Sequence, residues 1–300
     1  MEVLARKYPT KRISTKRLAT RLKRRDALIQ TIIQSRRPNL VIISLMSKKP
    51  WSAPPRYLFR RYNVLSQIKK LSDARTFIDV GCGAGDLACT LASQLGMSGV
   101  GTDFNNEAIE LAGRIRQAYG LKSNPEFKKL DGSEIKELKP ADVVFCMEVL
   151  EHVKGDKKLL AELVGLSKKY VVISVPAHQK LFTTSDELAG HYRRYEKDSL
   201  IKLLGQNGLE VRTFLAYGYP FTNMLRWMRE AVSFFVKRKQ GLSTMEKRSK
   251  KSGTDLLGIN KYFSSWLPVL VYPLFQISRI FNRTNLSEGY LVICQKSNKL

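Results

Sequence analysis

The chain has 300 residues, 43% of them hydrophobic, a length that suits one elaborated domain or one domain with appendages. Its formal net charge of +26 favours a polyanionic partner, either an anionic lipid surface or nucleic acid. The four cysteines lack paired metal-binding spacing, so we expect them to be small buried hydrophobes in a reducing compartment.

The excess positive charge is confined to two segments. Residues 1–70 carry 19 lysines and arginines against two acids, and residues 220–285 carry 12 against three, whereas the rest of the chain is neutral. We therefore expect a neutral catalytic core with two basic appendages that dock on a polyanionic surface.

Residues 1–55 are interpreted as a basic arm and linker. Leucine and isoleucine recur near helical spacing over 15–34, which is compatible with a basic amphipathic helix. Three interpretations stay open: a solvated disordered arm, a helix on a membrane surface, and a mitochondrial transit peptide. The expected location is therefore the cytoplasm or a membrane periphery, with a mitochondrial alternative.

A helix is expected over 57–71, and a glycine-rich turn follows it. Residues 77–88 change from an apolar run to alternating glycines and then to helical spacing, which predicts a buried strand, a tight turn and a helix start. Gly81, Gly83 and Gly85 would let a ligand approach the bare backbone. Asp79 precedes them, and its carboxylate would repel a dinucleotide pyrophosphate but attract the ammonium group of S-adenosylmethionine (SAM).

The next strand supports the same cofactor. It ends at Asp103, about 20 residues past the glycines, where a carboxylate can hydrogen-bond ribose hydroxyls, and Phe104 is placed to flank an adenine. With the D-x-G-x-G-x-G run, these features resemble class I SAM-dependent methyltransferases over about 75–217 and the strand near 289–296. The resemblance implies that Asp131 and Gly132 hold the adenine amino group and that Met147, after the strand 142–146, borders the cofactor.

Strand and helix patterns alternate along the core, which predicts an α/β fold with a Rossmann-like, mostly parallel sheet and helices on both faces. The resemblance implies that the last strand, 289–295, is antiparallel. The methyltransferase domain is expected over 56–219 and 286–300. The expected strands are 76–80, 98–103, 126–130, 142–146, 169–175 and 209–217, and the expected helices are 86–95, 105–119, 156–167 and 197–207.

Residues 220–285 form a long insertion before the last strand, where the family usually has a short hairpin. Residues 221–236 are expected to form a helix that is apolar nearly all round, and basic runs follow it. The segment 262–278 has no charge but contains Pro268 and Pro273, so we favour an interfacial or pocket role over a membrane span. The insertion is interpreted as a substrate lid or a membrane-contacting segment.

Candidate catalytic residues follow the fourth and fifth strands. The run from Glu148 to His152 resembles a segment of ubiquinone-biosynthesis O-methyltransferases and the E-x-x-E-H cluster of metal-dependent enzymes that methylate the terminal ribose of small RNAs. One hypothesis is that Glu148, Glu151, His152 and His191 hold a divalent ion. The other is that His152 or His191 is a general base, while the glutamates favour a helix N-terminus.

These features predict a SAM-dependent methyltransferase that acts on a hydroxyl of a small or lipid-like acceptor. The alternatives are an RNA methyltransferase and a catalytically inactive SAM-fold module that docks through its basic segments. An anionic membrane surface is the favoured partner and nucleic acid the alternative.

Overall fold

The computed structural model describes residues 51, 53–130, 134–240 and 267–297, which form one seven-stranded sheet with the order β3-β2-β1-β4-β5-β7-β6. Strand β7 pairs antiparallel with both β5 and β6, and the other pairs are parallel. The predicted sheet and its antiparallel last strand are therefore confirmed. The strands are β1 (Thr76–Val80), β2 (Ser98–Asp103), β3 (Glu126–Lys129), β4 (Ala141–Met147), β5 (Ser167–Pro176), β6 (Leu209–Ala216) and β7 (Gly289–Lys296).

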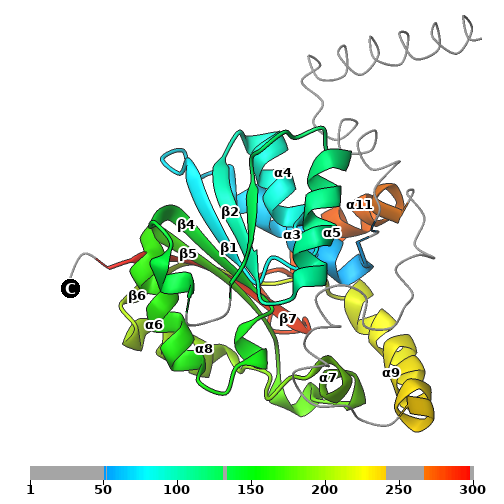
Figure 1. Ribbon diagram of the computed structural model, residues 1–300. Helices are drawn as coiled ribbons and strands as arrows, with labels where there is room; N and C mark the ends of the chain where they lie inside the picture. Colours follow the sequence, from blue (N-terminus) through cyan, green and yellow to red (C-terminus); the bar gives the residue numbers. More distant parts are fainter. Residues whose placement is uncertain (1–50, 52, 131–133, 241–266, 298–300) are drawn as a thin grey trace, which may run out of the picture. The chain divides into compact units, whose positions relative to one another are not determined.

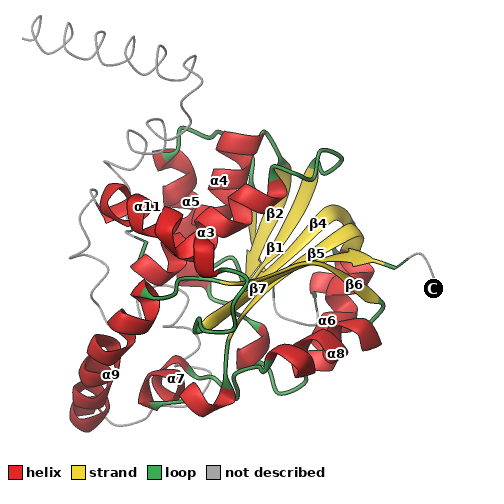
Figure 2. Ribbon diagram, turned by 180° about the vertical axis from the view of Figure 1, so that it is seen from behind, coloured by secondary structure: helices red, strands yellow, loops and turns green. Residues whose placement is uncertain are grey.

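Helices cover both faces of the sheet, as Figures 1 and 2 show. Helices α6 (Asp156–Leu166) and α8 (Lys197–Gln206) lie on one face, and α3 (Pro55–Ile68), α4 (Asp86–Leu95) and α5 (Asn106–Ala118) lie on the other. Buried apolar residues of β4 and β5 pack between these layers, because a parallel sheet must be covered on both sides. The order of the strands brings the carboxyl ends of β1, β2, β4 and β5 to one edge.

Short helices connect the larger elements at that edge. They are η1 (Ile135–Glu137), η2 (Leu150–His152), η3 (Gln179–Leu181) and α7 (Thr184–Ala189). The sequence patterns did not predict them, because helices of three to six residues are too short to show a periodicity. One of them, η2, nevertheless carries the candidate residues Glu151 and His152.

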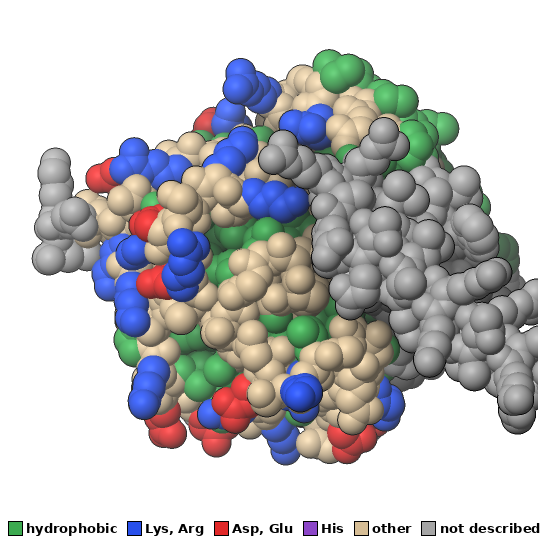
Figure 3. All heavy atoms as spheres, turned by 90° about the horizontal axis from the view of Figure 1, so that it is seen from above, with side chains coloured by type: hydrophobic (Ala, Val, Ile, Leu, Met, Phe, Trp, Pro, Cys, Tyr) green, Lys and Arg blue, Asp and Glu red, His purple; other side chains and the backbone are tan. Residues whose placement is uncertain are grey.

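The long insertion contributes α9 (Phe221–Gln240), α11 (Leu267–Ser278) and η5 (Arg279–Phe281). Helix α11 packs on α3, where the rings of Phe275 and Tyr62 lie 5.0 Å apart. Within the described ranges, no helix combines the length and hydropathy that a bilayer crossing requires. Residues 1–50 and 52 of the N-terminal arm and residues 262–266 of the segment 262–278 lie outside the described residues. In the view from above, basic side chains are scattered among acidic ones over the described surface (Figure 3).

A buried ion pair fixes α3 against the start of α4. The guanidinium of Arg61 contacts the carboxylate of Asp86, and the hydroxyl of Tyr119 donates to the same carboxylate at 2.7 Å. The side chains of Arg61 and Asp86 are 3% and 1% exposed, so solvent cannot replace either partner. Helix α3 is therefore tied to the turn between β1 and α4.

Replacement of Arg61 by methionine should destabilise the fold by about 3–5 kcal/mol, because Asp86 would keep a buried charge without its cation. Urea denaturation followed by circular dichroism measures the change. The double variant Arg61→Met, Asp86→Leu should recover much of the loss, since it removes both charges. A single variant as stable as the parent would show that this pair does not fix α3.

Candidate active site

The turn between β1 and α4 forms a cradle of bare backbone. Gly81, Gly83 and Gly85 have φ angles of 73°, 52° and 70°, a region that side chains rarely adopt. A Cβ atom at Gly81 would collide with Val149, and one at Gly85 would lie 2.6 Å from the ring of Phe127. Glycine is therefore required at Gly81 and Gly85 by both conformation and space, and at Gly83 by conformation.

Asp103 closes this cradle from the end of β2. Its carboxylate accepts the amide hydrogens of Gly83 at 3.0 Å and Asn105 at 2.9 Å. Burial raises the pKa of Asp103, although these backbone donors oppose the shift. Phe104 follows with 40% of its surface exposed. The structure thus places both residues beside the glycine turn, while Asp131 and Gly132 lie outside the described residues.

Asp79 lies at the centre of a small cleft under α3. Burial raises the pKa of its carboxyl to about 7; Asp103 adds to the shift and Arg60 opposes it. The cleft brings together several of the predicted cofactor residues with side chains of α3. Its lining includes Asp79, Gly81, Met147, Tyr57, Arg60 and Arg61. A ligand with a positive group would relieve the cost of ionising Asp79.

Glu148, directly after β4, is bound to arginines of α3. Its carboxylate lies 2.9 Å from a guanidinium nitrogen of Arg56 and 3.6 Å from one of Arg60, and it accepts the hydroxyls of Ser174 and Tyr217, each at 3.2 Å. Burial alone would raise the pKa of Glu148, but Arg56 and Arg60 hold it at about 2. Its backbone has a positive φ of 61°, which turns the chain sharply at the end of the strand.

Glu151, His152 and His191 converge beside that turn. One ligand atom from each residue lies within 4.8 Å of the others, and the two imidazole rings are 4.6 Å apart. Glu151 is fully buried, and within the described part of the chain neither of its oxygens has a hydrogen-bond partner. Burial raises the pKa of Glu151 well above its usual range, and the neighbouring Glu148 adds to this. Glu148 itself does not join the three.

Asp186 of α7 orients His191. Its carboxylate lies 2.8 Å from Nδ1 of His191. It also accepts hydrogen bonds from Nε of Arg194 at 2.9 and 3.0 Å, and Nη2 of the same guanidinium lies 2.9 Å away. Burial alone would raise the pKa of Asp186, but His191 and Arg194 lower it strongly, so the group is ionised. Nδ1 of His191 therefore donates to Asp186, and Nε2, which lies 4.0 Å from a Glu151 oxygen, is left as an acceptor.

The other histidines differ in their surroundings. Burial lowers the pKa of His152 to about 3, and His191 adds to the shift, so the His152 imidazole is neutral at pH 7. His178 does not belong to the cluster, because it packs against Tyr290 and lies 3.4 Å from Glu196. Sequence reasoning missed Asp186, Arg194, Arg56 and Arg60. The only local signal was Thr183 three residues before Asp186, the pattern of a capping box, which the structure contains.

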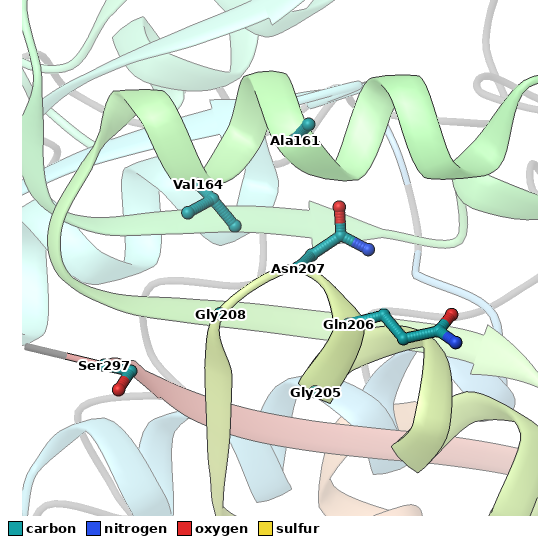
Figure 4. A pocket seen from close by; sticks show the side chains of 7 residues that line it. All are labelled: Ala161, Val164, Gly205, Gln206, Asn207, Gly208 and Ser297. Carbon is teal, nitrogen blue, oxygen red and sulfur yellow. The ribbon is translucent and has the colours of Figure 1, made fainter. Parts of the chain in front are cut away.

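A second hollow lies at the opposite edge of the sheet (Figure 4). It is formed where α6, the end of α8 and the end of β7 meet, and none of its lining residues is titratable. They are Ala161, Val164, Gly205, Gln206, Asn207, Gly208 and Ser297. The hollow therefore offers no group for acid–base or metal chemistry.

Comparisons with known proteins agree with this geometry. A family profile described as "Methyltransferase domain" matches residues 71–211. The ubiquinone biosynthesis O-methyltransferase of Rickettsia canadensis (strain McKiel) is 27% identical over 166 residues, 50% of this chain and 66% of that protein. Its namesake from Aliivibrio fischeri (strain MJ11) is 30% identical over 164 residues, 49% of this chain and 69% of that protein. For the namesake from Rickettsia felis (strain ATCC VR-1525 / URRWXCal2), at 34% identity, the match covers 35% of this chain and spans only 38% of that protein.

Solved structures show the same fold. A provisionally named sarcosine dimethylglycine methyltransferase from Galdieria sulphuraria superimposes with a TM-score of 0.51 at 13% identity, covering 80% of this chain and 85% of that one. The [4+2]-cyclase SpnF superimposes with a TM-score of 0.50 at 15% identity, covering 79% of this chain and 80% of that one. The fold alone therefore does not fix the reaction.

The sheet order, the glycine cradle and the sequence relatives define the class. The chain belongs to the class I SAM-dependent methyltransferases, whose cofactor is SAM.

Replacement of Asp79 by asparagine should stabilise the cofactor-free protein at high pH. The folded pKa of about 7 exceeds the ordinary value of 3.8, so the carboxyl costs progressively more stability as pH rises from about 4 to 7. The variant should therefore unfold at a higher temperature than the parent at pH 8, and this advantage should vanish near pH 4. Differential scanning calorimetry measures both.

The same variant should bind SAM at least about tenfold more weakly at pH 8, because it loses a charged partner for the ammonium group. Isothermal titration calorimetry checks this. Equal affinities would remove Asp79 from the cofactor site, and equal unfolding temperatures at pH 8 would show that its burial carries no cost.

Proposed function

We propose that the protein transfers the methyl group of SAM to a hydroxyl of a small, lipid-like acceptor. The observation that carries the proposal is the buried carboxylate of Glu151 beside two imidazoles, one of them held by Asp186. This cluster follows β4 directly, a few residues after Met147 of the cofactor cleft. The relatives are named for O-methylation in ubiquinone biosynthesis, which is in keeping with a hydroxyl acceptor.

The cofactor side needs orientation rather than activation. The sulfonium carbon of SAM is already electrophilic, so the protein contributes by holding it in line with the acceptor oxygen. Asp79, Asp103 and the glycine cradle would hold the ammonium, the ribose and the backbone of the methionine part, respectively. Helix α3 covers this cleft with Arg60 and Tyr57, which would exclude water from the bound cofactor.

The acceptor side needs a way to remove a proton. Nδ1 of His191 donates its hydrogen bond to Asp186. Nε2 of the same ring can therefore take up the proton that the hydroxyl of the methyl acceptor loses. The imidazolium that results would be stabilised by the ionised Asp186, which Arg194 holds in place. Without a bound cation, His191 would be the general base of the reaction and Asp186 its positioning residue. With a cation bound, the same Nε2 would be a ligand instead.

Glu151, His152 and His191 also fit a divalent cation. Two buried carboxylate oxygens without partners in the described residues, and a His152 imidazole that is neutral at pH 7, are suitable donors. Asp186 would be the outer carboxylate that such a histidine ligand usually has. A bound cation would lower the pKa of an acceptor hydroxyl. Glu148 would not be a ligand, since its carboxylate is taken by Arg56 and Arg60.

Peripheral association with an anionic membrane is part of the proposal, and it rests on the basic segments of the sequence and on the lipid-like acceptor. An RNA acceptor remains the alternative, and catalytic inactivity is the third outcome. A turnover assay with methyl-tritiated SAM against lipid, quinone-precursor and RNA fractions separates them.

The variant Glu151→Gln should lower turnover at least 10²-fold in the fraction that supports activity, because it removes the buried charge that completes the cation site. Its SAM affinity should stay unchanged, since Glu151 is not part of the cofactor cleft. A chelator should abolish the parent activity, and Mg²⁺, Mn²⁺ or Zn²⁺ should restore it.

Glu196→Gln is the matched control, because Glu196 lies near a histidine outside the cluster and its side chain is half exposed. It should behave like the parent. If chelator and Glu151→Gln have no effect while His191→Ala reduces turnover about 10²–10⁴-fold, His191 acts as a simple base without a metal.

A further inference from the structure

In helix α9 the polar face is turned toward the protein and the apolar face toward solvent. Amphipathic helices of globular proteins normally bury an apolar stripe and expose polar residues. From Thr222 to Lys237, the described side chains at buried and half-buried positions of α9 are polar, whereas those at exposed positions are apolar. The sequence predicted a helix that is apolar nearly all round, and the structure instead shows two distinct faces. The inner face comprises Thr222, Arg226, Arg229, Glu230, Ser233 and Lys237.

The inner face is held by polar contacts. Arg229 pairs with the fully buried Glu288 at 2.7 Å, and Lys237 pairs with Glu187 of α7. The carboxylate of Glu230 accepts the amide hydrogen of Ser185, also in α7, at 3.4 Å. Figures 1 and 2 both show α9 beside α7. The helix is therefore fixed in this orientation, and its apolar face cannot turn inward without breaking these pairs.

The outer face exposes large apolar side chains along three turns. Trp227 is 74% exposed, Met228 67%, and Met224 and Phe235 66% each. Phe234 is 57% exposed, and Val232 and Leu225 add to the same surface. Contiguous apolar surface of this kind is rare on a protein that works alone in water and marks a contact with an apolar partner.

The charges around this face identify the partner. Helix α9 carries five basic residues against Glu230 alone, and two of them, Arg229 and Lys237, are already paired on the inner face. The excess that remains comes from the sequence around the helix, because residues 220–285 carry 12 lysines and arginines against three acids. The guanidinium of Arg226 lies over the ring of Trp227, 5.4 Å from its centroid. Tryptophan, phenylalanine and methionine next to basic residues are typical of helices that lie in the interface of an anionic bilayer.

We propose that the outer face of α9, from Met224 to Phe235, docks on an anionic lipid bilayer with the helix axis in the membrane plane. The proposal names the membrane-contacting surface and deepens the lipid-like acceptor proposed above, but it does not depend on methyl transfer. Because the inner face of α9 contacts α7, the bilayer would lie about one helix diameter, ~10 Å, from the element that carries Asp186. A lipid-like acceptor could then reach the active site without crossing bulk water.

Co-sedimentation of the full-length chain with vesicles tests the docking surface. The parent should bind phosphatidylcholine vesicles that contain 30% phosphatidylglycerol and should bind pure phosphatidylcholine much more weakly. The double variant Trp227→Glu, Phe235→Glu should lose at least tenfold in affinity for the anionic vesicles. Its SAM affinity should equal that of the parent, which shows that it is folded whether or not the proposed reaction is correct.

Ile201→Glu is the matched control, because Ile201 is an exposed apolar residue on α8, a helix that lies apart from α9 in both views. It should bind vesicles like the parent. Equal sedimentation of the double variant and the parent would overturn the proposal and leave vesicle binding to other basic segments. A parent that ignores vesicles but is dimeric by light scattering, with a monomeric double variant, would assign the face to a second copy of the chain and also overturn it.

Discussion

Carboxylates buried at the carboxyl edge of the sheet need positive partners, and this need organises the rest of the molecule. Asp86 is neutralised by Arg61, Glu148 by Arg56 and Arg60, and Asp186 by Arg194. Removal of the positive partner from any of these pairs would leave a buried charge uncompensated. The cost would be a large fraction of the free energy of unfolding of a typical domain. The paired carboxylates thus hold α3 and α7 against the sheet.

Two other carboxylates are less well compensated, and they mark where ligands belong. Burial raises the pKa of Asp79 to about 7 despite Arg60, and Glu151 is buried without a hydrogen bond from the described residues. One lies in the cleft under α3 and the other beside His152 and His191. Buried carboxyl groups with raised pKa values are typical of functional sites, since a bound ligand can supply the positive charge or hydrogen bonds that the protein does not.

The fold and the cofactor side could be predicted from the sequence because they depend on local patterns. Alternating strands and helices, the glycine spacing and Asp103 at the end of a strand are all visible in short windows. The catalytic side could be predicted only in part. Glu151, His152 and His191 do converge, but Glu148 has a different partner, because Arg56 and Arg60 lie about 90 residues earlier in the chain.

The orientation of α9 also could not be predicted from the sequence. Its apolar residues are numerous enough to suggest burial all round, and only the pairs Arg229–Glu288 and Lys237–Glu187 decide which face turns inward. Such long-range pairs have no periodic signature. They are, however, what connects the insertion to α7 and hence to the histidine that Asp186 orients.

We propose that this site methylates an oxygen atom. The most direct measurement is to incubate the full-length protein with ¹³C-methyl-labelled SAM, Mg²⁺ and anionic vesicles loaded with a lipid extract, and to identify the labelled product by NMR and mass spectrometry. The account predicts a labelled methyl group bonded to oxygen on a lipid-extractable molecule. A label on nitrogen or carbon, or in added RNA instead of the lipid fraction, would contradict it.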